Sequence, residues 1–143
     1  MDIAFPILNL VLGAFLGVAF KYWYDYRGMV YKELWEKRCT AYKRLFSMTG
    51  ILPDYPEKAE VRYQQLFERS REMSDWFFGE GGLLCSKETR NKYFKVQDNI
   101  SEVLQNKSLK RTETITKEYD SIRDLMSQLR RAMTDDLMSR SRM

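Results

Sequence analysis

The sequence contains no histidine among its 143 residues and only two cysteines, Cys39 and Cys85. Without an imidazole, the chain cannot form a Ser-His-Asp or Cys-His nucleophile system, a zinc site with histidine ligands or a histidine acid–base pair. Two cysteines are too few for a four-cysteine zinc site or an iron–sulfur cluster. Asp135 and Asp136 lie in a polar stretch, where no burial would tune them for proton transfer. We therefore expect no catalytic residues, no metal and no cofactor.

Charged residues are absent from one long segment near the N-terminus, Ile3–Phe20. As an α-helix, its eighteen residues would span about 27 Å, close to the roughly 30 Å hydrocarbon core of a bilayer. Lys21 and the aromatic residues Tyr22–Tyr24 follow directly, as is typical of a membrane interface. A cleaved signal peptide would need a basic leader, whereas this chain opens with Met1-Asp2. The sequence predicts a retained anchor over residues 1–24, with a buried helix of a soluble core as the alternative.

Basic residues follow the predicted anchor and do not precede it. Between residues 21 and 44 there are seven Lys or Arg against three Asp or Glu, whereas only Asp2 lies before the segment. The positive-inside rule therefore places the N-terminus outside and the remainder of the chain in the cytoplasm. Two cysteines with no evident pairing agree with a reducing compartment. Membrane lipids are then expected partners.

One face of the predicted anchor carries small and polar residues. Asn9, Gly13, Gly17 and Lys21 follow one another at intervals of four and share a helical face. Gly13 and Gly17 form a GxxxG pattern, which lets helix backbones approach closely in lipid, and an amide within lipid needs a partner or water. This face predicts self-association or the lining of a pore. Alternatively, the glycines are only part of the usual composition of membrane helices.

Beyond the anchor, apolar residues recur at intervals of three and four, with no alternating strand pattern. The spacing predicts an all-α fold, with a cytoplasmic bundle of about four helices over residues 25–138 and a frayed tail over 139–143. We expect the first helix to end before Gly50, and the second to run from Pro56 to about Phe78. Ser86 would cap the third helix and Thr112 the fourth.

Each predicted helix has an apolar stripe that we expect in the bundle core. The stripes are Tyr31, Leu34, Trp35, Tyr42, Leu45 and Phe46; then Val61, Leu66, Phe67, Met73, Trp76 and Phe77; then Tyr93, Phe94, Val96, Ile100, Val103 and Leu104; and finally Ile115, Tyr119, Ile122, Leu125, Met126, Leu129 and Met133.

A glycine-rich loop precedes the third predicted helix. Backbone N–H groups at Gly81 and Gly82, with Ser86 and Lys87 at the helix start, would suit a phosphate or a nucleotide. The segment matches neither the P-loop nor the dinucleotide fingerprint. The alternative is an ordinary turn between helices whose glycines need a positive φ.

Three consecutive aromatic residues, Trp76, Phe77 and Phe78, end the second predicted helix. They span about 200° of the helix circumference, so one of them should point away from the core. Exposed aromatic clusters are typical of subunit or partner interfaces. The alternative is a core segment with a loop folded over it.

Basic residues are interspersed with acidic ones, and the net charge is only +4. This balance argues against a nucleic-acid surface and favours attraction to anionic lipid near the anchor.

A short string, Arg90-Asn91-Lys92-Tyr93-Phe94-Lys95, resembles the Arg-polar-x-x-x-His signature of HEPN ribonucleases. Arg90 and Asn91 fit the signature, but Lys95 stands where the catalytic histidine belongs. The resemblance implies a helical relative without ribonuclease activity. The overall layout is similar to small HEPN-like membrane proteins that accompany bacterial RNA-targeting CRISPR systems, and implies assembly into membrane pores in antiviral defence.

Two functions follow as expectations. The first is a non-enzymatic, homo-oligomeric protein of a bacterial inner membrane, pore-forming or membrane-perturbing in defence. The second is a membrane-tethered adaptor whose helical domain binds a soluble protein or a nucleotide.

Overall fold

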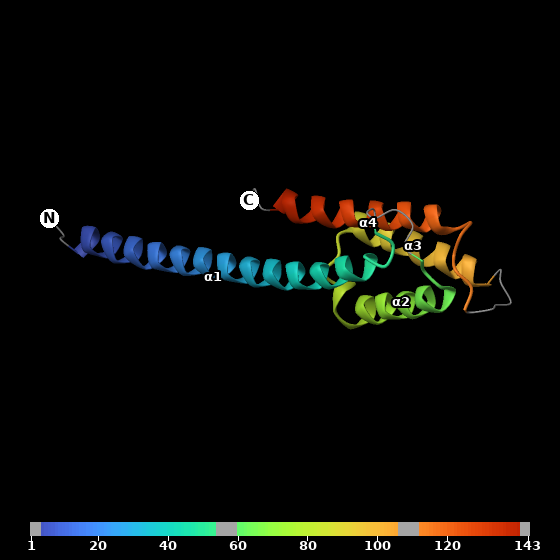
Figure 1. Ribbon diagram of the computed structural model, residues 1–143. Helices are drawn as coiled ribbons and strands as arrows, with labels where there is room; N and C mark the ends of the chain where they lie inside the picture. The colour runs from blue at the N-terminus through green and yellow to red at the C-terminus, as the bar shows by residue number, and fades with distance from the viewer. Residues whose placement is uncertain (1–3, 54–59, 106–111, 141–143) are drawn as a thin grey trace. The chain divides into compact units, whose positions relative to one another are not determined.

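The computed structural model describes residues 4–53, 60–105 and 112–140; the side chains of residues 4–11 and 139–140 lie outside this description. The regular structure of the described residues is helical. One isolated antiparallel bridge pairs Arg62 with Thr114, outside the helices. The helices are α1 (Ala4–Thr49), α2 (Tyr63–Trp76), the π-helical turn η1 (Phe77–Gly81), α3 (Lys87–Gln105) and α4 (Tyr119–Arg140) (Figure 1). The predicted all-α fold class is therefore confirmed.

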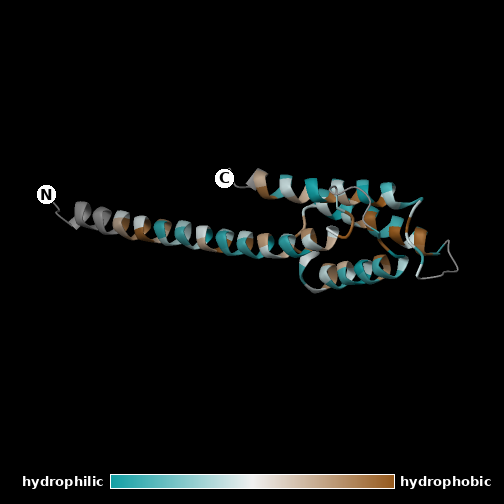
Figure 2. Ribbon diagram, viewed as in Figure 1, coloured by the Kyte–Doolittle hydropathy of each residue, from teal (hydrophilic) through white to brown (hydrophobic). Residues whose placement is uncertain are grey.

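The chain divides into two compact units, Met1–Lys37 and Arg38–Met143, and α1 contributes to both. Among the described residues, no helix combines the length and the apolarity needed to cross a bilayer. The predicted anchor over residues 1–24 falls partly outside those residues, because residues 1–3 and the side chains of residues 4–11 are not described. In Figure 2 the first coloured turns of α1 are white to brown, and hydrophilic turns follow.

The second unit is an up-and-down bundle of the end of α1 with α2, α3 and α4 (Figure 1). Helix α3 packs on both α2 and α4. The largest side chains with almost no exposure come from the four α-helices and from the turn after α1: Tyr42, Leu45, Leu52, Tyr63, Leu66, Met73, Trp76, Ile100, Ile122, Met126, Leu129 and Met133. Most of the stripe expected on the last helix is buried: four of its members are at most 1% exposed, whereas Leu125 is only partly buried and Ile115 lies before α4 begins.

Of the predicted helix starts, the one at Pro56 lies outside the described residues and the one at Thr112 is wrong. Pro56 is outside the described residues, and α2 begins at Tyr63. Thr112 caps no helix, because α4 begins only at Tyr119. Instead, the backbones before the two helices pair: the Ile115 N–H donates to the Val61 carbonyl at 2.8 Å, and the Tyr63 N–H donates to the Glu113 carbonyl at 3.1 Å.

That pairing has a physical reason. Val61 and Ile115 are 3% and 2% exposed, so both side chains enter the core from non-helical backbone. Buried backbone groups must find hydrogen-bond partners, and the two segments supply them to each other. The isolated bridge between Arg62 and Thr114 lies between these bonds.

Several residues expected in the core are exposed. In the first unit Tyr31, Leu34 and Trp35 are 64%, 49% and 41% exposed. In the bundle Phe46, Phe67 and Phe94 are 48%, 42% and 42% exposed. Helical periodicity identifies an apolar face, but it does not show that the same chain covers that face.

Candidate functional site

The first described side chains of α1 form an apolar surface without cover from their own unit. Leu12, Phe15, Leu16, Val18 and Phe20 are between 51% and 74% exposed. At about 100° per residue these five side chains spread over more than half of the helix circumference. A helix that is apolar over so wide an arc is normally buried in a large core or in a membrane.

The predicted small-residue face lies on the same helix. A Cβ added to Gly13 or Gly17 would meet nothing within 4 Å, so no described part of the chain packs closely on either glycine. Lys21 is exposed at the end of the row. The side chain of Asn9 lies outside the described residues. Oligomer contact or pore lining by this face stays a prediction.

Aromatic residues continue along α1. Tyr22, Trp23, Tyr24 and Tyr26 are 79%, 53%, 75% and 61% exposed. The Arg27 guanidinium lies over the Trp23 ring, 4.6 Å from its centroid, as in a cation–π contact. Mixed aromatic and basic surface of this kind suits the interface between lipid and water.

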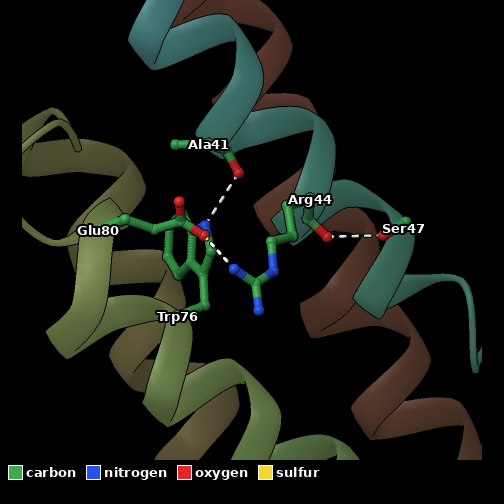
Figure 3. Close-up of polar contacts among 5 residues, drawn as sticks. All are labelled: Ala41, Arg44, Ser47, Trp76 and Glu80. Atoms are coloured by element: carbon green, nitrogen blue, oxygen red, sulfur yellow. Dashed lines mark hydrogen bonds and ion pairs between the residues drawn. The ribbon is translucent and has the colours of Figure 1, made fainter.

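The aromatic run at the end of α2 divides between core and surface. Trp76 is 1% exposed and donates its Nε1–H to the Ala41 carbonyl of α1 at 2.9 Å (Figure 3). Next to it, the Arg44–Glu80 ion pair of 2.5 Å joins α1 to η1. Phe78 is 82% exposed, so it is the aromatic that points away, as the helix geometry predicts. Trp76 belongs to the core and presents no surface to a partner. An interface role for Phe78 stays a prediction.

A groove of about 650 Å³ lies between α2 and α3. Phe67, Phe78 and Phe94 line it with partly or largely exposed rings. Two of its polar residues pair with each other: the Ser70 Oγ donates to the Gln97 Oε1 at 2.6 Å, and the Gln97 Nε2 donates to the Ser70 carbonyl at 3.0 Å. Arg71 and Asp98 also line the groove, so it offers apolar rings together with charged groups. The sequence did not predict this groove, because Phe67 and Phe94 follow the helical periodicity of the core and were assigned to it.

The anion or ligand role of the glycine-rich loop stays a prediction. In the structure the Gly82 N–H donates to the Phe77 carbonyl at 2.8 Å. The Ser86 Oγ accepts a hydrogen bond from the Thr89 N–H at 3.2 Å and so caps α3, as predicted for the cap itself. The carbonyl of Gly82 accepts a hydrogen bond from the Arg90 Nη2 at 2.9 Å, so the Arg90 guanidinium binds the backbone of the loop. Lys87 is exposed.

The glycines are needed for space and not for a positive φ. Gly82 has a right-handed φ of −60°. A Cβ at Gly81 would lie 2.1 Å from the Trp76 ring, closer than any real contact. The helix also does not end at Phe78 but continues as η1 to Gly81. The expected turn with positive φ is therefore wrong, and close packing on Trp76 explains the glycine at position 81.

The residues that resemble the HEPN signature lie in the N-terminal half of α3. Arg90, Asn91 and Lys95 are all exposed, and Arg90 binds the preceding loop.

A buried polar cluster joins α1, α3 and α4, and sequence reasoning missed it. The Tyr42 hydroxyl donates to the Asp136 Oδ2 and accepts from the Ser86 N–H at 3.2 Å. Asp136 is 9% exposed, which corrects the expectation that it lies in an unburied polar tail. Contacts between residues 94 positions apart leave no local sequence pattern.

Burial shapes the titration of this cluster. Burial, together with the hydrogen bond to Asp136, raises the pKa of the Tyr42 hydroxyl above its usual range. Burial raises the pKa of the neighbouring Cys85 thiol to about 11, so the thiol is protonated and unreactive at neutral pH. These groups hold the bundle together rather than present a nucleophile.

Within the described parts of the chain, no three Cys, Asp or Glu side chains gather as a metal site would require. The sequence matches no protein-family model. It also matches no curated protein and no solved structure, so the case for a function rests on its own residues.

Proposed function

We propose that this chain is a non-catalytic protein that is anchored in a membrane by its N-terminal segment and associates with copies of itself. Its bundle would lie in the cytoplasm of a bacterium and its N-terminus on the outer side of the inner membrane. The observation that carries the proposal is the exposed apolar surface from Leu12 to Phe20, which its own unit leaves uncovered.

Three sequence and surface features support a bilayer as the cover. The segment Ile3–Phe20 is uncharged, and the exposed rings of Tyr22–Tyr26 follow it. Basic residues exceed acidic ones after the segment, on the side that would face anionic lipid. The open backbone at Gly13 and Gly17 supports a second copy as a neighbour within the membrane.

The anchor is tested by a charge near the middle of the segment. Leu12→Arg should move the full-length protein from the carbonate-washed membrane fraction to the supernatant, because a central arginine costs about 2.5–3.5 kcal/mol on insertion. Leu83→Arg is the matched control, since Leu83 is 95% exposed in the bundle. Wild-type protein released by carbonate would contradict the anchor.

Self-association is tested by the mass of the intact protein in detergent, with the detergent contribution subtracted. A discrete assembly of several chains supports the proposal, and dye release from liposomes then tests membrane perturbation. A monomer at every concentration would exclude the assembly.

The groove between α2 and α3 favours a second candidate function, a tethered adaptor that docks an amphipathic helix of a soluble protein. Replacing residues 1–20 with an unrelated membrane helix separates the two. An adaptor would keep its function after the exchange, whereas a protein that acts through its membrane helices would lose it.

A further inference from the structure

The groove between α2 and α3 has two walls of similar composition. Each wall presents an aromatic ring, a charged group and a hydroxyl group at intervals of four and three residues, which places them on one face of their helix. These residues are Phe67, Arg71 and Ser74 on α2, and Phe94, Asp98 and Ser101 on α3.

The more deeply buried polar groups of the groove are paired within the protein. The Gln97 Nε2 donates to the Ser70 carbonyl at 3.0 Å and to the Tyr93 hydroxyl at 3.1 Å, and the Gln97 Oε1 accepts from the Ser70 Oγ at 2.6 Å. The Tyr93 hydroxyl donates in turn to the Met73 carbonyl at 3.1 Å. An apolar chain can therefore lie over these groups without leaving their hydrogen bonds unmade.

The groove is long and narrow. Its lining runs from Tyr63 to Phe78, about 22 Å at 1.5 Å per residue. Over that length, its volume of about 650 Å³ corresponds to a mean cross-section of about 30 Å². An α-helix with its side chains is roughly 10–12 Å across, a cross-section of about 80–110 Å². A helix can rest on the rim of this groove, but only a single extended chain fits inside it.

The charges on the two walls are of opposite sign. Arg71 and Asp98 directly follow Ser70 and Gln97, the pair that joins the walls, and both are exposed. Within the part of the chain that the structure describes, neither forms an ion pair. A ligand head with only a negative charge would be repelled by Asp98, and one with only a positive charge by Arg71. A head that carries both charges complements both walls.

We infer that the groove binds a single-chain zwitterionic lipid of the lysophosphatidylethanolamine type. Its acyl chain lies along the rings of Phe67 and Phe94. Arg71 binds the phosphate, which a guanidinium recognises through paired N–H donors, and Asp98 binds the ammonium group. The site lies wholly within the second unit, so it does not depend on the proposed anchor.

Photo-labelling gives the first test. Lysophosphatidylethanolamine with a diazirine in its acyl chain is added to the full-length protein in an alkyl maltoside, a detergent with an uncharged head. Labelled peptides should carry Phe67 or Phe94. Unlabelled lysophosphatidylethanolamine should compete at least tenfold better than glycerophosphoethanolamine, which has the same head and no chain. Labelling confined to residues 4–20 would overturn the inference and leave the anchor standing.

Charge variants give the second test. Arg71→Gln and Asp98→Asn should each raise the Kd from a labelling titration about three- to fivefold, as expected for exposed ion pairs. Asp98→Asn should also abolish the preference over lysophosphatidylglycerol, which lacks the ammonium group. Glu102→Gln and Arg131→Gln are matched controls, because both side chains are exposed and lie outside the lining. Wild-type affinity in both groove variants would overturn the inference.

The same experiments separate this ligand from a docked helix. If the groove serves a helix of a soluble partner instead, the wild-type protein will show no labelling of α2 or α3 that unlabelled lipid competes away. That result overturns the lipid site and leaves the adaptor function standing.

Discussion

The two units of this protein use the same type of side chain in opposite ways. In the bundle, Trp76 is 1% exposed and its indole N–H donates to a backbone carbonyl of α1. Tyr93 is 2% exposed, and its hydroxyl donates to the Met73 carbonyl at 3.1 Å. In the first unit, Trp35 and Tyr24 are 41% and 75% exposed.

This difference shows which unit buries its own large apolar side chains. Burying a large apolar side chain contributes about 1.5–3 kcal/mol, and a buried tyrosine or tryptophan also needs a hydrogen-bond partner. The bundle meets both conditions with its own residues. The first unit leaves its described apolar side chains exposed, and function is best sought where folding alone leaves surface uncovered.

The largest effect expected from this comparison comes from the two tryptophans. Trp76→Ala should lower the free energy of unfolding by about 3–5 kcal/mol, because it empties a core site. Trp35→Ala should change it by only about 0.5 kcal/mol, as for an exposed residue. Urea unfolding of the detergent-solubilised protein, followed by circular dichroism, measures both. Equal losses would mean that the two units do not differ as described.

Sequence patterns predict the helices well where one face is buried by the same chain. The Ile122–Met126–Leu129–Met133 stripe has its full period and is buried. Ser86 was correctly expected to cap α3, because capping is a local interaction. Local chemistry of this kind can be read from a few neighbouring residues.

Long-range contacts could not be predicted in the same way. The pairing of Val61 with Ile115 and the bond between Tyr42 and Asp136 join residues far apart in the sequence. The apolar stripe at Tyr31 was expected in the bundle because periodicity identifies a face and not its partner. The close approach of Gly81 to Trp76 depends on the π-helical turn, which has no sequence signature as clear as a helix cap.

The two glycines of η1, Gly79 and Gly81, should differ in how much their substitution destabilises the bundle, and this effect is of intermediate size. Gly81→Ala should lower the free energy of unfolding by about 1–3 kcal/mol, because the new methyl group overlaps the Trp76 ring. Gly79→Ala is the control in the same turn, since its Cβ would meet nothing within 4 Å. Thermal unfolding of the two variants in parallel measures the difference. A Gly81→Ala protein as stable as Gly79→Ala would show that η1 does not pack on Trp76 as the structure has it.

The smallest of the three effects concerns a single hydroxyl group. Tyr42→Phe removes the donor to Asp136 and the acceptor for the Ser86 N–H, and should lower the free energy of unfolding by about 1–2 kcal/mol. Tyr31→Phe removes a hydroxyl from an exposed ring in the first unit and should leave stability unchanged.

The same buried cluster predicts a loss of stability in alkaline solution. The pKa of the Tyr42 hydroxyl and that of the Cys85 thiol, at about 11, are both raised in the folded protein. The unfolded chain therefore releases these protons at lower pH than the folded one does. The stabilisation they give is complete below pH about 8, where both states hold the protons because an unfolded thiol has a pKa of about 8.5, and is lost as the pH rises through the folded pKa values. Urea unfolding between pH 8 and about 11 should show a falling free energy of unfolding, with a shallower fall for Tyr42→Phe than for Tyr31→Phe. Equal slopes for the two variants would mean that the burial of Tyr42 does not govern its ionisation, and the contrast between buried and exposed tyrosines would then fail.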